Sequence, residues 1–493
     1  MTTIDVHGSE ELKAALAQAE AGWRIRLAPG LYPDMVETSA SGSEADPIVL
    51  EPLGDGWIDG GKAPTHQMYD RGFDNFALIR FQKSKHIKIE KLHIKNCWPA
   101  IFQFKDCNDI TIAGNKLLHG TNAILVRRSM GFVVMHNSWH QDDSKDHKLW
   151  HEVSWVEAHG GEGGTGSKQY YNGSFFSGKD SSDILIRDNL ISDCYNGVRI
   201  KVDVIPAAGD KLTNANVRIL ANRFVRVRDN PIEPERYAYN WHVAWNHIED
   251  AHAWFSFDGV RGGFVYIYGN TAFFKSRQGL KTETRHTMGR VLKLSYVSTK
   301  AEEYPGRGTP DFPWYVMHNS FVLRCPIIGG AARLVPTPPC EGVGPNFTTR
   351  LNFKNNVFQW CDPSKSGSHV CEWISMFSNF ERRPGDQNEF DGSLTNRADY
   401  LAQARSLGLG EAAGLEAHGP LFTNPSAGNF ELSAQSPGRS TAAGLDIATP
   451  CGETLKLRTN EGGKLHRGAI QDYGFVALEG GDEPPTLPGH RTA

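Results

Sequence analysis

Residues 219–281 read ILANRFVRVRDNPIEPERYAYNWHVAWNHIEDAHAWFSFDGVRGGFVYIYGNTAFFKSRQGLK. One short phrase occurs three times here, as ILANRF, VAWNHI and IYGNTA, and its asparagines are Asn222, Asn246 and Asn270. The two steps between them are equal, with short alternating apolar runs on both sides of each asparagine. A fixed period in the low twenties with alternation inside each unit indicates a solenoid of β-strands. The stretch therefore predicts an all-β chain folded as a right-handed parallel β-helix.

The same asparagine returns along most of the chain. It stands at Asn115, Asn137 and Asn189 upstream and at Asn319 and Asn356 downstream. Asparagine at a repeated turn can adopt the left-handed conformation and hydrogen-bond along a stack, so we expect a ladder of these side chains. The repeats predict about ten to twelve coils.

The two ends of the chain differ from the repeats between them. SEELKAALAQAE, residues 9–20, predicts a helix with Ser9 as its N-cap, which would cover the open N-terminal end of the solenoid. Beyond about residue 393 the repeat changes, and ADYLAQARSLG predicts a second short helix. We expect residues 1–392 to form the β-helix with its cap, and residues 393–493 to form terminal coils and a tail.

Composition excludes several classes of function. The chain of 493 residues carries a formal net charge of −4, which predicts no nucleic-acid partner and no anionic membrane. Its apolar runs are shorter than the roughly 20 residues of a spanning helix. The first residues, MTTIDVHGSEELKAAL, do not form a signal peptide, which predicts a cytoplasmic protein unless a leader has been removed. The pattern leaves the oligomeric state open.

Acidic residues recur at one place in the repeat. Counted from Asn222, Glu233 is at +11 and Glu235 at +13; counted from Asn246, Asp258 is at +12. Adjacent coils lie about 4.8 Å apart, so facing carboxyls on two coils would be about 5 to 6 Å apart, as in a retaining glycosidase. Carboxyls that close cannot easily both ionise, which suits one of them to act as an acid. These three acidic residues are the predicted acid, base or nucleophile.

Residues near this acidic column are candidates for holding a sugar. Arg127, Lys201 and Lys281 occupy the same place in other repeats, where they would bind an anionic sugar or pair with the acids. Asp229 begins the DNPIEPE segment, and Trp254 in WFSFDG is a candidate for stacking on a pyranose ring. The competing interpretation is that these charges form an ordinary solvated face of a β-helix.

The step from Asn137 to Asn189 is 52 residues, which is one coil and a long insertion at about 139–179. Long loops on rigid solenoids commonly bind ligands, so we expect this one to cover the substrate. His147, His151 and Glu152 form an HxxxHE pattern that would suit a metal only on a helix, and we predict no metal there.

The opening of the chain resembles that of the alginate lyase and chondroitinase B family. The residues that carry the resemblance are ELKAALAQAEAGWRIRLAPGLY followed by PIVLEPLGDGWIDGG, and further on EPE at 233–235 resembles that family's GEPEIISVKSSGN segment. The resemblance implies a β-helix acting on polysaccharides, with Glu233 and Glu235 as calcium ligands. The family's catalytic Lys and Arg positions fall on Asn240 and Asp258.

These departures favour hydrolysis by paired carboxylates over the family's elimination chemistry. The predicted function is thus a glycoside hydrolase acting on a polysaccharide or oligosaccharide, without a required cofactor, although calcium stays open. A lyase or C5-epimerase acting on a uronic-acid polymer, with Lys201 or Lys281 as base, is the alternative. A non-catalytic carbohydrate-binding solenoid is the third.

Overall fold

The computed structural model describes most of the chain. The described residues are 2–64, 75–159, 166–203, 212–257, 260–275, 289–293, 313–323, 329–330, 350–361, 387–442, 444–452, 454–459, 466–468 and 476–477.

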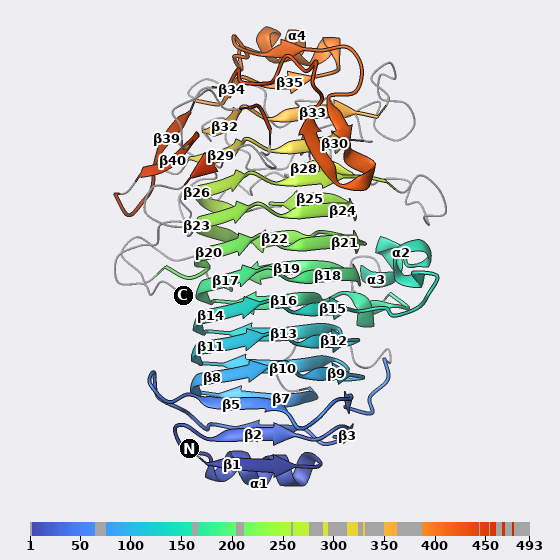
Figure 1. The fold of residues 1–493 in the computed structure, drawn as a ribbon, viewed down its shortest axis with the longest axis vertical. Coiled ribbons are helices and arrows are strands. Elements are labelled where there is room, and N and C mark those ends of the chain that lie inside the picture. Colours follow the sequence, from blue (N-terminus) through green and yellow to red (C-terminus); the bar gives the residue numbers. More distant parts are fainter. Residues whose placement is uncertain are drawn as a thin grey trace, which may run out of the picture.

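Three long parallel sheets run side by side along the molecule (Figure 1). In the described part of the chain, sheet A contains 13 strands: β1 (Thr3–Val6), β2 (Arg24–Leu27), β5 (Ile48–Pro52), β8 (Lys85–Glu90), β11 (Asn108–Ala113), β14 (Met130–Met135), β17 (Ser182–Arg187), β20 (Ala215–Leu220), β23 (Tyr237–Ala244), β26 (Arg261–Tyr268), β29 (Trp314–Met317), β32 (Leu351–Lys354) and β34 (Glu389–Asp391). Sheet B contains 13 strands among the residues that the structure describes: β3 (Gly30–Leu31), β6 (Ile58–Asp59), β9 (His93–Lys95), β12 (Lys116–Leu118), β15 (Ser138–His140), β18 (Leu190–Cys194), β21 (Arg223–Val227), β24 (His247–Ala251), β27 (Thr271–Phe273), β30 (Ser320–Leu323), β33 (Val357–Trp360), β35 (Leu394–Thr395) and β36 (Leu415–Glu416). Sheet C contains 10 strands within the described residues: β4 (Val36–Thr38), β7 (Ala77–Gln82), β10 (Ala100–Lys105), β13 (Asn122–Arg127), β16 (Ser174–Lys179), β19 (Asn196–Lys201), β22 (Ile232–Glu235), β25 (Ala253–Ser256), β28 (Arg290–Lys293) and β31 (Gly329–Gly330).

From β4 to β33 the chain visits the three sheets in the order C, A, B, and each full turn there adds one parallel strand to each sheet. The fold is therefore a parallel β-helix, as the repeat predicts. Stacked aromatic side chains fill its centre, for example Phe81 on Phe104 with ring centroids 5.0 Å apart. Because coils stack in register, a residue type repeated once per coil becomes a column along the molecule.

The predicted asparagine ladder is present in the turn between sheets A and B. The Asn246 side-chain amide donates to Asn270 Oδ1 at 3.0 Å, and Asn222 Nδ2 donates to Asn246 Oδ1 at 3.0 Å. One detail of the prediction is wrong, because the left-handed residue is the one before each asparagine, such as Trp245 or His318. The asparagines thus keep an ordinary backbone and use their side chains to pair buried main-chain groups.

The N-terminal helix α1 (Ser9–Gln18) lies across the first coil, as expected (Figure 1). Leu12 and Leu16 are buried and join the main core. Ser9 is not the predicted N-cap: it is the first helical residue, the N-cap is Gly8, and the Ser9 hydroxyl accepts from the backbone N–H of Asp34 at 3.1 Å. None of the helices in the described residues is long and apolar enough to cross a membrane.

The described residues of the insertion between β15 and β16 form three short helices on one side of the coils (Figure 1). They are α2 (Lys148–Glu152), α3 (Trp155–His159) and the 3₁₀ helix η3 (Gln169–Tyr171). His147 Nδ1 lies 2.8 Å from Asp193 Oδ1, and Arg226 holds the same carboxylate at 2.6 Å. The insertion is therefore tied to sheet B at its N-terminal end.

The C-terminal segment returns over the coils. Helix α4 (Ala398–Ser406) lies at the opposite end from α1, and its Tyr400 joins the main core (Figure 1). β37 (Phe422–Asn424), η5 (Pro425–Ala427) and β38 (Asn429–Leu432) form a hairpin that packs on sheet B, where Phe430 belongs to one cluster with Val322. β39 (Leu445–Ala448), β40 (Thr454–Thr459) and β41 (Val476–Ala477) form a small sheet, and Leu457 packs beside Tyr266 of sheet A.

Candidate functional site

The EPE segment forms β22, a short strand near the middle of sheet C. Side chains on a strand alternate between its two faces. Ile232 points into the core, whereas Glu233 and Glu235, one and three residues after it, point outward. Their register partners on β19 are Arg199 and Lys201. The strand therefore presents two acids beside two bases on one face.

Arg199 binds both acids of β22. Its Nε lies 3.4 Å from Glu233 Oε2, and its guanidinium also donates to Glu235 Oε1. Lys201 Nζ lies 3.5 Å from the second oxygen of Glu235. Glu235 thus contacts two cations, whereas Glu233 has only the weaker contact with Arg199.

Glu233 is the more buried acid, with 8% of its surface exposed. Its Oε1 accepts from Asn230 Nδ2 at 3.2 Å and from the Ser256 hydroxyl at 3.3 Å. Burial raises the pKa of Glu233 to about 7, Arg199 partly opposes this, and the charge of Glu235 reinforces it. A carboxyl with such a pKa is half protonated near neutrality, which suits general acid catalysis.

Asp229 and His252 lie in the turns that precede β22 and β25. His252 Nδ1 is 3.5 Å from Asp229 Oδ1, and both side chains are almost fully buried. Burial alone would raise the pKa of Asp229, but its contact with His252 and the charge of Lys293 hold that pKa well below its usual range. Asp229 is therefore a fixed negative charge that helps to keep Glu233 protonated.

The insertion borders this turn through α3. His159 Nδ1 lies 3.0 Å from the Tyr195 hydroxyl, and the His159 ring stacks on Trp155 with centroids 4.0 Å apart. The charge of His159 also contributes to the low pKa of Asp229. The insertion predicted to cover substrate therefore lies close to Asp229 through α3, and its residues 160–165 lie outside the described part of the chain.

A column of basic residues leads to the two acids along sheet C. Lys105 pairs in register with Arg127, Arg127 with Lys179, Lys179 with Lys201, and Lys201 with Glu235. The sequence-based placement of Arg127 and Lys201 in one column with Glu235 is therefore correct. Lys105 and Lys179 were missed, although they stand at the same step from Arg127 and Lys201.

Other predicted residues have different places. Trp254 is fully buried and its ring lies 5.5 Å from that of Phe321, so the predicted stacking on a sugar is wrong. The reason is its position next to the corner between β24 and β25, where strand alternation does not hold.

Asp258 and Lys281 lie outside the described residues, and the pairing of Glu235 with Asp258 stays a prediction.

Sequence reasoning also missed Arg199, Ser256 and Lys293, which form one column with Glu233. Ser256 is adjacent to Glu233, and Lys293 is the register partner of Ser256 on β28. Arg199 stands well over one repeat before Glu233 because the turn after β19 is lengthened by an insertion. Counting from the preceding asparagine, which puts Arg199 at +10 and Glu233 at +11, is the signal that would have found the pair.

The residues at β22 do not fit the calcium implied by the family resemblance. The Arg199 guanidinium contacts both Glu233 and Glu235, so a cation already stands at the position where two calcium ligands would converge. Within the described residues no group of three or more Asp, Glu, His or Cys side chains is arranged to hold a metal. This also applies to His147 and His151 of the insertion.

Comparison with known proteins yields structural likeness without sequence likeness. No family model matches this chain, and no curated protein sequence matches it. Among solved structures, it is similar to the GH136 lacto-N-biosidase from Eubacterium ramulus (TM-score 0.41, 9% identity, 73% of this chain and 64% of that one). It is also similar to the Family 28 exopolygalacturonase of Yersinia enterocolitica (0.41, 8%, 80% and 74%) and to the PL6 family alginate lyase AlyGC (0.38, 13%, 97% and 58%). These neighbours are glycoside hydrolases and polysaccharide lyases, and this chain spans less than two thirds of the first and the third.

Proposed function

We propose that this protein is a carbohydrate-active enzyme that hydrolyses a glycosidic bond, with Glu233 as the general acid. The observation that carries the proposal is the unequal environment of two acids on one strand. Burial raises the pKa of Glu233, while Glu235 lies against Arg199 and Lys201, whose positive charges favour its ionised form. Two carboxyls with opposite protonation are what glycoside hydrolysis requires. The family resemblance of the opening and of EPE supports a saccharide as the substrate.

The roles follow from charge and contact. Glu233 would protonate the leaving glycosidic oxygen, and its proton would return from water after the bond is broken. Glu235 would act as the base that activates water or as the nucleophile. Asp229 would act through Glu233 by keeping it protonated. Of the three predicted catalytic residues, Glu233 and Glu235 therefore carry the proposal, because Asp258 lies outside the described residues.

The column Lys105, Arg127, Lys179 and Lys201 supports a substrate that carries negative charge. Coils repeat at about 4.8 Å, so the column offers basic groups at regular intervals along the axis. A polysaccharide with acidic sugars would lie along it and reach Glu233 and Glu235 at its end. We further propose that no metal takes part, because Arg199 supplies the positive charge between the acids.

The same bases favour one second candidate, β-elimination on a uronic-acid polymer. Arg199 and Lys293 lie near Glu233, and Lys201 lies beside Glu235. Such cations would neutralise a uronate carboxylate while a lysine removes the neighbouring proton. Elimination forms a carbon–carbon double bond in the product that absorbs ultraviolet light, whereas hydrolysis forms only a new reducing end.

The test is a screen of neutral and uronic-acid polysaccharides read for reducing ends and for ultraviolet absorbance. Wild type is compared with Glu233→Gln, and with Glu249→Gln on sheet B as the matched control. Reducing ends without absorbance, lost only in Glu233→Gln, are expected. Absorbance would replace hydrolysis by elimination, and full activity of Glu233→Gln would remove β22 from the mechanism.

A further inference from the structure

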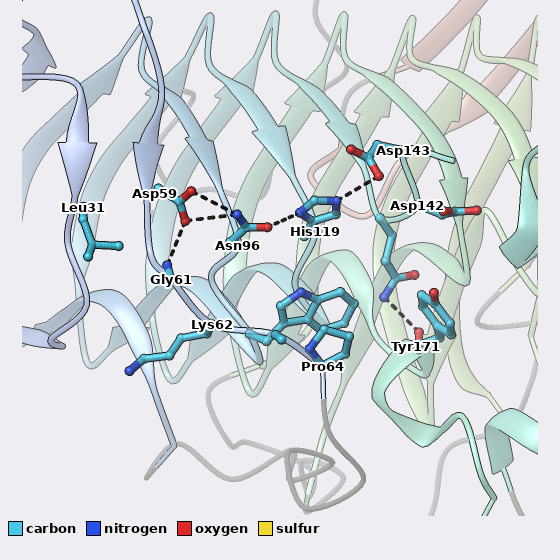
Figure 2. A pocket seen from close by; sticks show the side chains of 13 residues that line it. Leu31, Asp59, Gly61, Lys62, Pro64, Asn96, His119, Asp142, Asp143 and Tyr171 are labelled. Atoms are coloured by element: carbon cyan, nitrogen blue, oxygen red, sulfur yellow. Dashed lines mark hydrogen bonds and ion pairs between the residues drawn. The ribbon is translucent and has the colours of Figure 1, made fainter. Parts of the chain in front are cut away.

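A second concave site lies away from the acids of β22, between the first coils and the insertion. Its cavity has a volume of about 470 Å³, which is within the range of small-molecule sites. Asp59, Asn96, His119, Asp143 and Tyr171 are among the residues that line it (Figure 2). Strand β12, which precedes His119, is three steps of sheet B from β21, which precedes Asp229. At the usual strand spacing this is about 14 Å along the axis.

A directed chain of hydrogen bonds crosses the cavity wall. Asn96 Nδ2 donates to both oxygens of Asp59, at 3.0 and 3.1 Å. A carboxylate only accepts, so this contact fixes the orientation of the amide and leaves Asn96 Oδ1 as the acceptor for His119 Nδ1 at 2.7 Å. His119 therefore carries a proton on Nδ1 and turns Nε2 toward Asp143, whose Oδ1 is 3.2 Å away (Figure 2).

Asp59, at the start of this series of hydrogen bonds, is held in place as a carboxylate. Burial alone would raise the pKa of Asp59, but the backbone N–H of Gly61, the Asn96 amide and Lys95 hold that pKa below its usual range. Asp143, at the other end, has a side chain that is 59% exposed. The series of hydrogen bonds is therefore fixed at Asp59 and accessible to solvent at Asp143. A ligand could replace the contact between His119 and Asp143 and bind both side chains.

An aromatic wall closes the cavity on the side of the insertion. The Trp98 ring meets the Tyr171 ring edge-on, with centroids 6.0 Å apart, and lies nearly parallel to His119. Gln141 is buried and donates to the backbone carbonyls of Tyr171 at 3.0 Å and Gly120 at 3.1 Å. Because Gln141 joins the insertion to the coils, the cavity is formed before any ligand arrives.

The polar groups of the cavity select the chemistry of the ligand. Three aspartates line it, Asp59, Asp142 and Asp143, against the single lysine Lys62, so the cavity disfavours an anion. Asp142 is occupied by backbone and hydroxyl donors of the insertion, including Leu149 N at 2.8 Å. Asp143 accepts, His119 Nε2 accepts when neutral and donates when charged, and an aromatic wall stands beside both. Adjacent hydroxyl groups on a ring with an apolar face match this arrangement.

From these contacts we propose that the cavity binds a neutral, hydroxyl-rich sugar at a site separate from Glu233. This inference rests on the proposed function only in taking the ligand to be a saccharide. The cavity and the basic column on sheet C then have opposite charge preferences. A substrate that combined acidic and neutral sugars would satisfy both, with neutral units at His119 and acidic units along Lys105 to Lys201.

The experiment measures binding in the Glu233→Gln background, so that catalysis does not consume the probe. Probes are maltose, cellobiose, lactose and mannobiose as neutral disaccharides and digalacturonate as the acidic one, each followed by ligand-observed NMR and calorimetric titration. Asp143→Asn and His119→Ala are the cavity variants. The control is Asp106→Asn, which changes a carboxylate that pairs with Arg128 elsewhere on the coils.

We expect at least one neutral disaccharide to bind and both cavity variants to weaken it tenfold or more, with Asp106→Asn unchanged. Asp143 is exposed, so its variant is expected to fold even if His119→Ala does not. Two results would overturn the proposal: no neutral disaccharide binds, or binding survives in Asp143→Asn. Both results are independent of whether Glu233 is catalytic, because activity is measured separately in the wild-type background.

Discussion

Arg199 Nε on β19 lies 3.4 Å from Glu233 Oε2 on the neighbouring strand β22, and the same guanidinium is hydrogen-bonded to Glu235. The three side chains are largely buried, with exposures of 15%, 11% and 19%. Such a group needs its positive centre, because two carboxylates on one face would otherwise repel each other in a poorly solvated place. This contact leads to the first prediction.

Arg199→Ala should destabilise the protein by about 3 kcal/mol, since removing one partner of a largely buried ion pair leaves charge uncompensated. Calcium should then raise the melting temperature of Arg199→Ala, because Glu233 and Glu235, without the guanidinium between them, offer oxygen ligands of the kind calcium prefers, although Glu235 still contacts Lys201. Wild type should show no such shift and should be active in a chelator. Thermal unfolding with and without calcium measures this. Wild-type activity that a chelator abolishes and calcium restores would contradict the interpretation.

Glu233→Gln should lower kcat by about 10²- to 10⁴-fold, the usual contribution of a general acid. The amide keeps the size of the side chain and its contacts with Asn230 and Ser256, and Arg199 keeps its ion pair with Glu235. The melting temperature should therefore change little at neutral pH. Initial rates and thermal unfolding are measured side by side with Glu249→Gln. Equal loss of activity in both variants would point to a general effect of removing acids from the coils.

Activity should fall as pH rises above about 7, because a general acid must carry its proton and the pKa of Glu233 is raised to about 7.

The stability of the fold should depend on pH in a different range. Folded Glu233 holds its proton up to about pH 7, while the unfolded chain releases it near 4.5, so the stability contributed here is present below 4.5 and lost as pH rises to 7. In Glu233→Gln that loss should disappear, which unfolding curves at several pH values would show. The low pKa of Asp229 acts oppositely, and its contribution is lost only as pH falls below about 3.8.

The fold could be predicted from the sequence because each coil of a solenoid repeats the same pattern of residues at a regular spacing. Asn222, Asn246 and Asn270 are equally spaced since each closes the same turn and each must reach the next asparagine. Counting from the preceding asparagine puts Arg127 and Lys201 at +12 and Glu235 at +13, and the three lie in one column. Local spacing is then equivalent to spatial neighbourhood, which is rare outside repeat proteins.

The site could be predicted only in part, because insertions break that equivalence. Arg199 and Glu233 are adjacent in space but well over one period apart in the sequence, so a search at the spacing of the asparagines passes over the pair. Trp254 fails for another reason: it lies beside a corner, where neighbouring residues both point inward. The cavity at His119 is lined in part by Tyr171. Tyr171 belongs to the insertion, which has no repeat, so the sequence does not predict where it lies.

Asn246→Ala should destabilise the protein by about 2–6 kcal/mol without abolishing activity, because alanine leaves two buried main-chain groups unpaired and each costs about 1–3 kcal/mol. The Asn246 Oδ1 accepts the backbone N–H of Asn222 at 2.9 Å, and its Nδ2 donates to the carbonyl of Ile219 at 2.8 Å. Chemical unfolding of the variant measures the loss, with Asn108→Ala on sheet A as the control because Asn108 is not in the ladder. Equal stability of the two variants would show that water replaces the ladder, and the ladder would then fix register more than it stabilises the fold.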